Sequence, residues 1–319
     1  QANVQATIDA AVKATAAAQP TATQTKPAAG ATAAATATKA SAATPVPTVN
    51  AVTMTEEQLD ALIDQAVNEA VAATNTATTQ TATYAADGTL TSQEVAAMQA
   101  AVTASQTEIN QALALTQAYY DLYADLATET LNVLKAIEQD LNSMATSMNS
   151  MAQSLTQINT TLSQGQALAQ STISQLQATA TKASQAAASA QTKEKNWNTT
   201  VQSDLNKRAT AALGTKPTSV PTDLRGTAQS VTTYIDTVKT ALGDNKIGKT
   251  ELQSISVAGA NAVAGLNQFG GAQGQTLANS INTMTKQLAR GEAPKAKNGL
   301  GALEQSARSL PSVPQPPRK

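Results

Sequence analysis

The sequence predicts an all-α, elongated protein in which one long coiled-coil-type helix is flanked by shorter helices. First, apolar or small residues recur in steps of three and four from Leu134 to Val201, which places them on one seam of a helix. Second, no proline occurs from residue 48 to residue 216, so this span contains no strong helix breaker. Third, 2% of the 319 residues are aromatic and 13% are charged. Such a composition suits helices packed through small side chains better than a dense globular core.

Five segments are expected in chain order, and local signals set their limits. Thr55 with Gln58 and Thr91 with Glu94 have the spacing of capping boxes, which begin helices, and Lys216–Pro221 interrupts the helical pattern. The segments are an Ala/Thr/Pro-rich arm or linker (1–53), an amphipathic helix and loop (54–90), the long coiled-coil helix or a helical hairpin (91–214), a C-terminal helical region (215–292) and a basic, Pro-rich tail (293–319). The amphipathic helix is expected to fade in the Thr-rich run 74–83.

The seam changes character along its length. It begins with the packing residues Leu134, Ile137, Leu141, Met144, Met148, Met151, Leu155, Ile158 and Leu162. It continues through Gly165 and Ala169, slips once in register, and then becomes mostly alanine. The slip beside Gly165 favours a hairpin that turns there, whereas the lack of Pro, Asn-Gly or Asp-Gly nearby favours one unbroken helix. The unbroken helix is our first expectation.

Charge is segregated along the chain. Residues 54–134 hold eleven acidic residues and no Lys or Arg, while residues 190–319 hold sixteen basic and eight acidic residues. Complementary blocks at opposite ends of a long subunit predict head-to-tail contacts between copies and an open polymer. Pairing within one chain is the alternative, and it requires a turn near Gly165.

The N-terminus indicates a location outside the cell. Numbering from Gln1 suggests that a signal peptide was removed, and the Thr-rich arm could carry glycans. The opening VQATIDAAVKATAAAQPTAT resembles the N-termini of secreted surface proteins of filamentous gliding bacteria. This resemblance covers about twenty residues and implies a secreted, extracellular or cell-surface location and no activity.

Two loops resemble the second half of an EF-hand calcium loop. Asp87 and Glu94 in the first loop have the same spacing as Asp244 and Glu251 in the second, with an aliphatic residue between them. The oxygen ligands of the first half of an EF-hand are missing. We therefore expect no metal site, and we expect Glu94 and Glu251 to cap helices.

Several other features of the sequence are candidate functional sites. Tyr119, Tyr123 and Trp197, with Asp121 and Asp125, form a possible interface, although aromatic pairs at helical spacing more often belong to a core. Residues 256–275 are rich in Gly and Ala and could insert into a membrane, but a small-residue helix packed against its neighbours explains them more simply. The basic run Lys286, Arg290, Lys295 and Lys297 fits a solvated face or a partner for the acidic block.

These observations favour a structural role without enzymatic activity, cofactor or metal. The chain has no His and no Cys, which removes the commonest general base and thiolate chemistry. The expected function is that of a secreted subunit which self-assembles into a filament, sheath or surface layer, with itself as partner and no nucleic acid. The alternatives are a pore-forming or translocator-type protein that inserts residues 256–275, and a coiled-coil stalk or adaptor of the cell envelope.

Overall fold

The protein is all-α in the part that a computed structural model describes, residues 53–244 and 246–310. This part contains eight α-helices and no strand, which confirms that the described part of the chain is all-α, as predicted. The predictions for the N-terminal arm and for the last residues of the tail concern residues 1–52 and 311–319, which lie outside the described residues.

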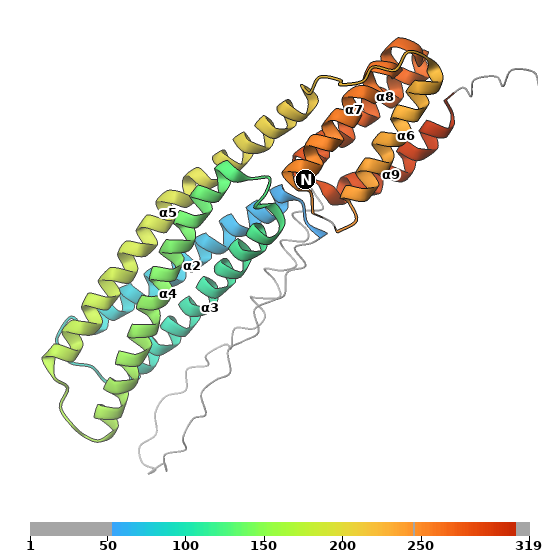
Figure 1. Cartoon of the computed structure of the whole chain (residues 1–319). Coiled ribbons are helices and arrows are strands. Elements are labelled where there is room, and N and C mark those ends of the chain that lie inside the picture. Colours follow the sequence, from blue (N-terminus) through green and yellow to red (C-terminus); the bar gives the residue numbers. More distant parts are fainter. Residues whose placement is uncertain (1–52, 245, 311–319) are drawn as a thin grey trace, which may run out of the picture. The chain divides into compact units, whose positions relative to one another are not determined.

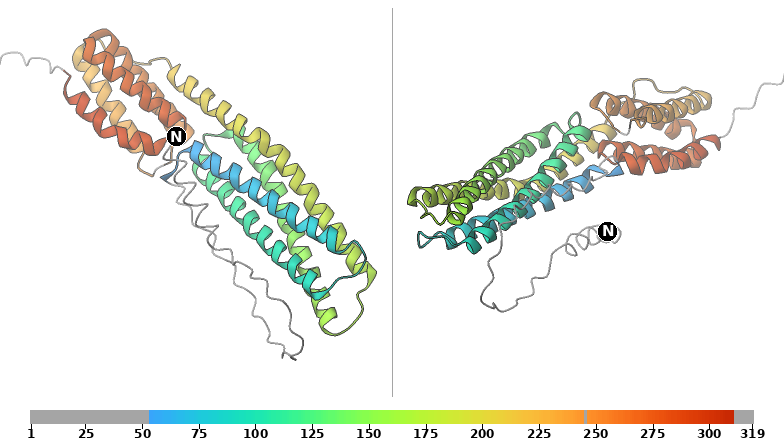
Figure 2. Two further views of the ribbon diagram at one scale, coloured as in Figure 1. Left: turned by 180° about the vertical axis from the view of Figure 1, so that it is seen from behind. Right: turned by 90° about the horizontal axis from the view of Figure 1, so that it is seen from below.

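The first four helices form an antiparallel bundle (Figures 1 and 2). They are α2 (Glu56–Tyr84), α3 (Ser92–Tyr123), α4 (Thr128–Ser163) and α5 (Gln170–Leu213). Each helix packs on the next one, and α5 returns to pack on α2. Two contacts show that α4 and α5 run in opposite directions: Asp204 of α5 meets Thr130 near the start of α4, and Lys193, earlier in α5, meets Asp140 further along α4. The bundle is therefore of the up-down-up-down type.

Four shorter helices follow, each packed on the next. They are α6 (Leu224–Ala241), α7 (Lys249–Phe269), α8 (Gly271–Ala289) and α9 (Ala293–Arg308). The helix α9 also packs on α6, and the last turns of α5 pack on α7 and α8. Tyr234 of α6 is fully buried in this group, and its hydroxyl donates to the Ile281 carbonyl at 3.2 Å.

The expected unbroken helix across 91–214 is wrong, because the chain turns twice within it. At the second turn Gly165 has φ +68°, and the Gln166 N–H donates to the Thr161 carbonyl at 3.1 Å. Together with the Gly165 N–H donating to the Leu162 carbonyl, this is a Schellman motif, in which glycine takes the left-handed position that ends the helix. The structure thus has the hairpin alternative near Gly165, and Gly165 and Ala169 lie exposed in its loop instead of on the seam.

The first turn, Ala124–Ala127, contains no glycine. Leu126 packs with the cluster of α6 to α9, whereas Tyr123 before it and Ala127 after it pack in the core of α2 to α5. The backbone leaves helical geometry at Ala127, with φ −97° and ψ 45°, and α4 begins at Thr128.

Two segment boundaries in the structure also differ from the predicted ones. The helix α2 continues through the Thr-rich run to Tyr84. Its threonine hydroxyls find partners without disturbing the helix: Thr74 hydrogen-bonds Ser105 of α3 at 2.8 Å, and Thr81 donates to the Ala77 carbonyl of its own helix. Residues 293–308, expected in the basic tail, form α9 instead. Its proline lies in the first turn, where no N–H is needed, and Ala296 and Leu303 are buried.

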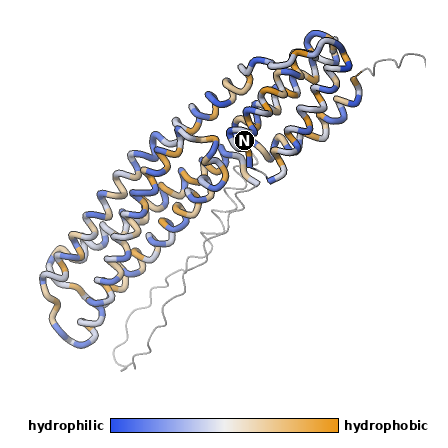
Figure 3. The backbone as a smooth tube through the Cα atoms, in the orientation of Figure 1, coloured by the Kyte–Doolittle hydropathy of each residue, from blue (hydrophilic) through white to orange (hydrophobic). Residues whose placement is uncertain are grey.

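The hydrophobic side chains gather in two main clusters. One lies among α2 to α5 and the other among α6 to α9. Hydrophobic and hydrophilic residues alternate in short patches along each helix (Figure 3), as expected for amphipathic helices.

Candidate functional site

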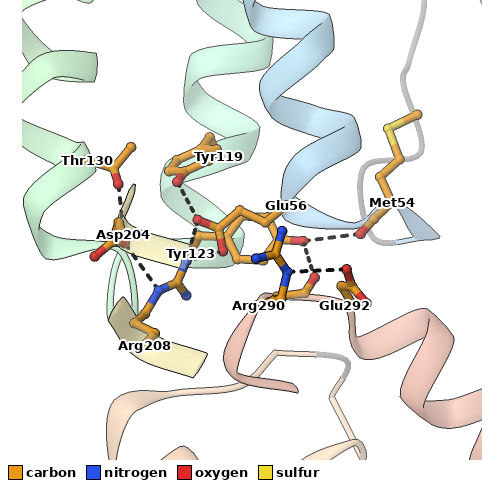
Figure 4. Close-up of polar contacts among 10 residues, drawn as sticks. Met54, Glu56, Tyr119, Tyr123, Thr130, Asp204, Arg208, Arg290 and Glu292 are labelled. Carbon is orange, nitrogen blue, oxygen red and sulfur yellow. Dashed lines mark hydrogen bonds and ion pairs between the residues drawn. The ribbon is translucent and has the colours of Figure 1, made fainter. Parts of the chain in front are cut away.

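A buried ionic network stands where the N-terminus of α2 meets the C-terminal part of α5 (Figure 4). Arg208 Nη2 on α5 donates to both oxygens of the Glu56 carboxylate at 2.7 Å, and Arg208 Nε lies 3.2 Å from Asp204 Oδ2. The Tyr119 hydroxyl of α3 donates to Glu56 Oε1 at 2.6 Å, and Thr130 of α4 donates to Asp204 at 3.3 Å. Each helix of the bundle therefore contributes to one connected set of polar groups.

Local sequence places these groups. Thr55 caps α2 through a capping box with Gln58, which fixes Glu56 as the first residue of the helix, where a carboxylate also interacts well with the helix dipole. Asp204 and Arg208 are one helical turn apart, so both side chains project from the same face of α5.

Burial controls the electrostatics of the network. The Glu56 side chain is 0% exposed, and the Arg208 side chain is 10% exposed. Burial raises the pKa of the Glu56 carboxyl, although the Arg208 guanidinium opposes this effect. Burial likewise raises the pKa of Asp204, again against Arg208. One guanidinium therefore compensates two buried carboxylates, and its loss would leave both without a cation.

The same end of the bundle is joined to the segment between α8 and α9. Gly291 has φ +67°, and its carbonyl accepts hydrogen bonds from the Glu56 N–H at 3.2 Å and from the Tyr123 hydroxyl at 3.3 Å. Arg290 Nη1 donates to Asn206 of α5 at 2.6 Å. A Cβ atom at position 291 would lie 2.5 Å from Glu56 Oε2. Only glycine fits this backbone conformation and this close approach together.

A cleft of about 410 Å³ opens beside the network between α5 and α7. Its charged lining is balanced, with the acidic residues Asp125, Glu129 and Asp204 and the basic residues Lys207, Arg208 and Lys249. Lys207 is already paired with Glu129 at 2.6 Å. The network itself holds its carboxylates by hydrogen bonds and an arginine, and this arrangement joins the four helices of the bundle.

The residues of the predicted interface divide into two groups. Tyr119 and Trp197 are 0% exposed and pack edge to face with ring centroids 5.3 Å apart, and Tyr123 packs on Tyr119. These rings join helices inside one chain and are not accessible to another. Asp121 and Asp125 are exposed.

The residues of the predicted seam lie together in the bundle core. All of them from Leu134 to Ile158 are 0% exposed, and Leu162 near the end of α4 is partly buried. The alanine part of the seam on α5 packs in the same core, since Ala183, Ala187 and Ala190 are 0% exposed. The large residues of α4 are thus matched with the small residues of α5 across one antiparallel pair.

Both EF-hand-like loops begin helices through their acidic residues. Asp87 Oδ1 accepts from the Thr89 N–H at 2.9 Å, which lowers the pKa of Asp87, and Glu94 Oε2 accepts from the Thr91 N–H at 2.8 Å. In the second loop Asp244 accepts from the Lys246 N–H and Glu251 accepts from the Gly248 N–H. Across the described residues no three acidic side chains are grouped as metal ligands.

The Gly/Ala-rich segment 256–275 covers most of α7 and the first residues of α8, packed against its neighbours. Gly259 is buried, and a Cβ there would lie 3.2 Å from the Tyr234 ring, while one at Gly265 would lie 2.7 Å from Thr227. Glycine lets α7 approach α6 and α8 closely. None of the helices in the described part of the chain is long and apolar enough to span a membrane.

The segregated charges pair in part within the chain. Arg208 and Lys207 from the basic block pair with Glu56 and Glu129 from the acidic block, at 2.7 and 2.6 Å. The fold-back near Gly165 makes these pairs possible. In the basic run, Arg290 and Lys295 both lie near Glu292, at 3.7 and 3.2 Å.

The sequence patterns did not predict this ionic network, although the seam of apolar residues on α5 leads to one of its members. Continued from Val201 in steps of four and three, the seam reaches Leu205 and Arg208. An arginine at a core position needs a buried carboxylate, and Glu56 was the acid nearest the start of the best-defined amphipathic helix.

Comparisons with known proteins give no relative from which a function could be transferred: no protein-family model, no curated protein and no solved structure matches this chain.

Proposed function

We propose that this chain is a secreted structural subunit that assembles with copies of itself into an extracellular filament, sheath or surface layer. The observation that supports a structural role is that the buried polar groups form hydrogen bonds between helices. The side chains of Glu56, Arg208 and Tyr123 form hydrogen bonds that connect the ends of different helices. Such bonds hold the helices in a fixed arrangement, as a structural subunit requires. The extracellular location rests on the resemblance of the N-terminus.

Contacts between copies would use the charged surface, because the apolar seam is buried within one chain. The helices α2 and α3 carry no Lys or Arg and eight acidic residues, all but Glu56 and Asp60 outside the buried core. The segment 271–308, with α8 and α9, carries five basic residues and two acidic ones. Asp121 on the first surface and Lys286 on the second are both exposed, so copies can meet through opposite charges.

Electron microscopy and sedimentation of the purified chain test this proposal. Polymers are expected at low ionic strength, and 0.5 M NaCl should disassemble them while the helical circular dichroism stays unchanged, because exposed charges are screened. Asp121→Lys should weaken assembly, and Asp236→Lys, the same change on an exposed position of α6, serves as the matched control. Particles that remain single chains under all conditions would refute self-assembly.

One observation favours the second candidate, an envelope stalk or adaptor. Among the described large hydrophobic side chains, Leu213 at 44% and Val220 at 50% are the exposed ones, which leaves no broad apolar surface for a permanent interface. A stalk needs no such surface along its length. Isolated single particles in the same micrographs would support this candidate.

A further inference from the structure

Three carboxyl groups from two helices meet on one side of the bundle without a paired cation. Asp60 and Asp64 lie one turn apart on α2, and Glu194 of α5 faces Asp64 and accepts from Asn68 of α2 at 3.1 Å. Asp60 is 2% exposed, and its Oδ1 atom has no hydrogen-bond partner. The indole Nε1 of Trp197, which is fully buried next to this carboxyl, makes no well-formed hydrogen bond either.

The groups around the cluster do not neutralise it. From α2, Glu56 and Glu57 add negative charge near Asp60. From α5, Lys195 acts weakly on Glu194, and the neighbouring Lys193 is held by Asp140 of α4 at 2.6 Å. Arg208 is bound to Glu56 and Asp204, and α3 contributes the Tyr119 hydroxyl, which also binds Glu56. The helix α2 itself contains no Lys or Arg.

We propose that Asp60, Asp64 and Glu194 form a proton-dependent clasp between α2 and α5, which is closed when the cluster holds protons and loosened when it releases them. This inference does not depend on the proposed function. A protonated Asp60 carboxyl can be buried beside Trp197, and a proton held between Glu194 and Asp64 lets one of these carboxyls donate to the other. Full ionisation instead leaves the Asp60 charge buried and places like charges on the facing Asp64 and Glu194.

The electrostatics agree with this geometry. Burial, followed by the nearby acids Asp64, Glu56 and Glu57, raises the pKa of Asp60 to about 7. Burial and the facing Asp64 carboxyl raise the pKa of Glu194 to about 7 as well. For acids with a raised pKa, the stabilisation is complete below the unfolded-state pKa, near 4, and is lost as the pH rises through about 7. Each pH unit in this window changes the opening equilibrium by up to about tenfold for each proton released.

The single tryptophan of the chain reports on the clasp, because Trp197 is the residue that the clasp covers. The experiment measures acrylamide quenching of its fluorescence in the full chain from pH 4.5 to pH 8.5. We expect quenching to increase with pH, with a midpoint near 7, while the far-ultraviolet circular dichroism remains helical.

Two isosteric variants and one control decide the outcome. Asp60→Asn and Glu194→Gln should each reduce the pH dependence, and the double variant should abolish it, since neither amide titrates. Asp121→Asn, at an exposed position of α3, should keep the wild-type profile. If Asp60→Asn fails to fold, Glu194→Gln still tests the clasp, because Glu194 is only partly buried. Wild-type quenching that does not vary with pH, or a double variant with the wild-type profile, would overturn the proposal.

Discussion

Replacing Arg208 with methionine removes the single guanidinium on which the buried network depends. Methionine keeps a comparable length of apolar side chain and supplies no hydrogen-bond donor. The carboxylate of Glu56, which is 0% exposed, loses two hydrogen bonds of 2.7 Å, and the Asp204 side chain, which is 7% exposed, loses its cation at 3.2 Å.

The expected loss of stability is large. Removing one partner of a buried ion pair costs about 3–5 kcal/mol, because the other partner remains as an uncompensated buried charge. Proteins of ordinary stability have about 5–15 kcal/mol in total. Since burial already raises the pKa of Glu56 and of Asp204, the variant can relieve part of the loss by protonation. The destabilisation should therefore be greater at pH 8 than at pH 5.

Urea unfolding followed by circular dichroism measures this loss, and Lys207→Met is the matched control. Lys207 is the neighbouring residue and has an equally short ion pair, 2.6 Å to Glu129, but the two side chains are 60% and 56% exposed. Exposed pairs contribute little because water screens them, so the control should unfold almost like the wild type. Equal unfolding midpoints for the two variants would refute the assignment of the network as a joint of the fold.

Three further predictions concern the turn at Gly291, the packing seam and the loops. Gly291→Ala should lower the free energy of unfolding for two reasons. The left-handed backbone costs an alanine about 1–2 kcal/mol, and the crowding of its Cβ atom against Glu56 costs about 1–3 kcal/mol. Gly271→Ala, also at positive φ but with open space around it, should show the first effect alone in the same thermal melts. Leu141→Asp and Leu155→Asp place a charge at positions that are 0% exposed and should lower the melting temperature strongly. Thr146→Asp, on the exposed face of α4, should not lower it. Equal melting temperatures for all three variants would show that this stripe is not a core. Millimolar calcium or a chelator should leave the melting temperature unchanged, because the loop carboxylates already accept backbone N–H groups, and a chelator-sensitive melt would contradict this.

Periodicity was sufficient to predict the buried face of α4. The stripe from Leu134 to Ile158 follows a strict alternation of three and four, and each of its members is fully buried. Capping boxes located the starts of α2 and α3 at Thr55 and Thr91, where the structure has them. Such signals are local, so they remain valid whatever the helix packs against.

The turns were harder to predict because tertiary contacts decide them. Gly165 is the one residue whose type indicates the hairpin. An interior glycine destabilises a helix by about 1 kcal/mol, which is too little to decide between a turn and a continuous helix. At Ala124–Ala127 no residue type indicates the turn. The residues there pack in different cores, Tyr123 in that of α2 to α5 and Leu126 in that of α6 to α9, and no local pattern predicts this division.

The ionic network and the carboxyl cluster depend on pairs that are far apart in sequence. Glu56 and Arg208 are separated by 152 positions, and Asn68 and Glu194 by 126. Single-residue patterns cannot assign such pairs until the order of the helices in the bundle is known. With the hairpin at Gly165 in place, the acidic α2 and the basic end of α5 become neighbours.

The central claim is that α4 and α5 fold back on each other within one chain, and cross-linking tests it most directly. Lys193 Nζ lies 2.6 Å from Asp140 Oδ2, so a zero-length carbodiimide reagent can join them, whereas one unbroken helix would hold these residues about 80 Å apart. Unlabelled and ¹⁵N-labelled chains would be unfolded, mixed, refolded together and then cross-linked before mass spectrometry. We predict an Asp140–Lys193 cross-link in which both peptides carry the same label. Peptides of mixed label at this link, or no link between these two residues, would contradict the account.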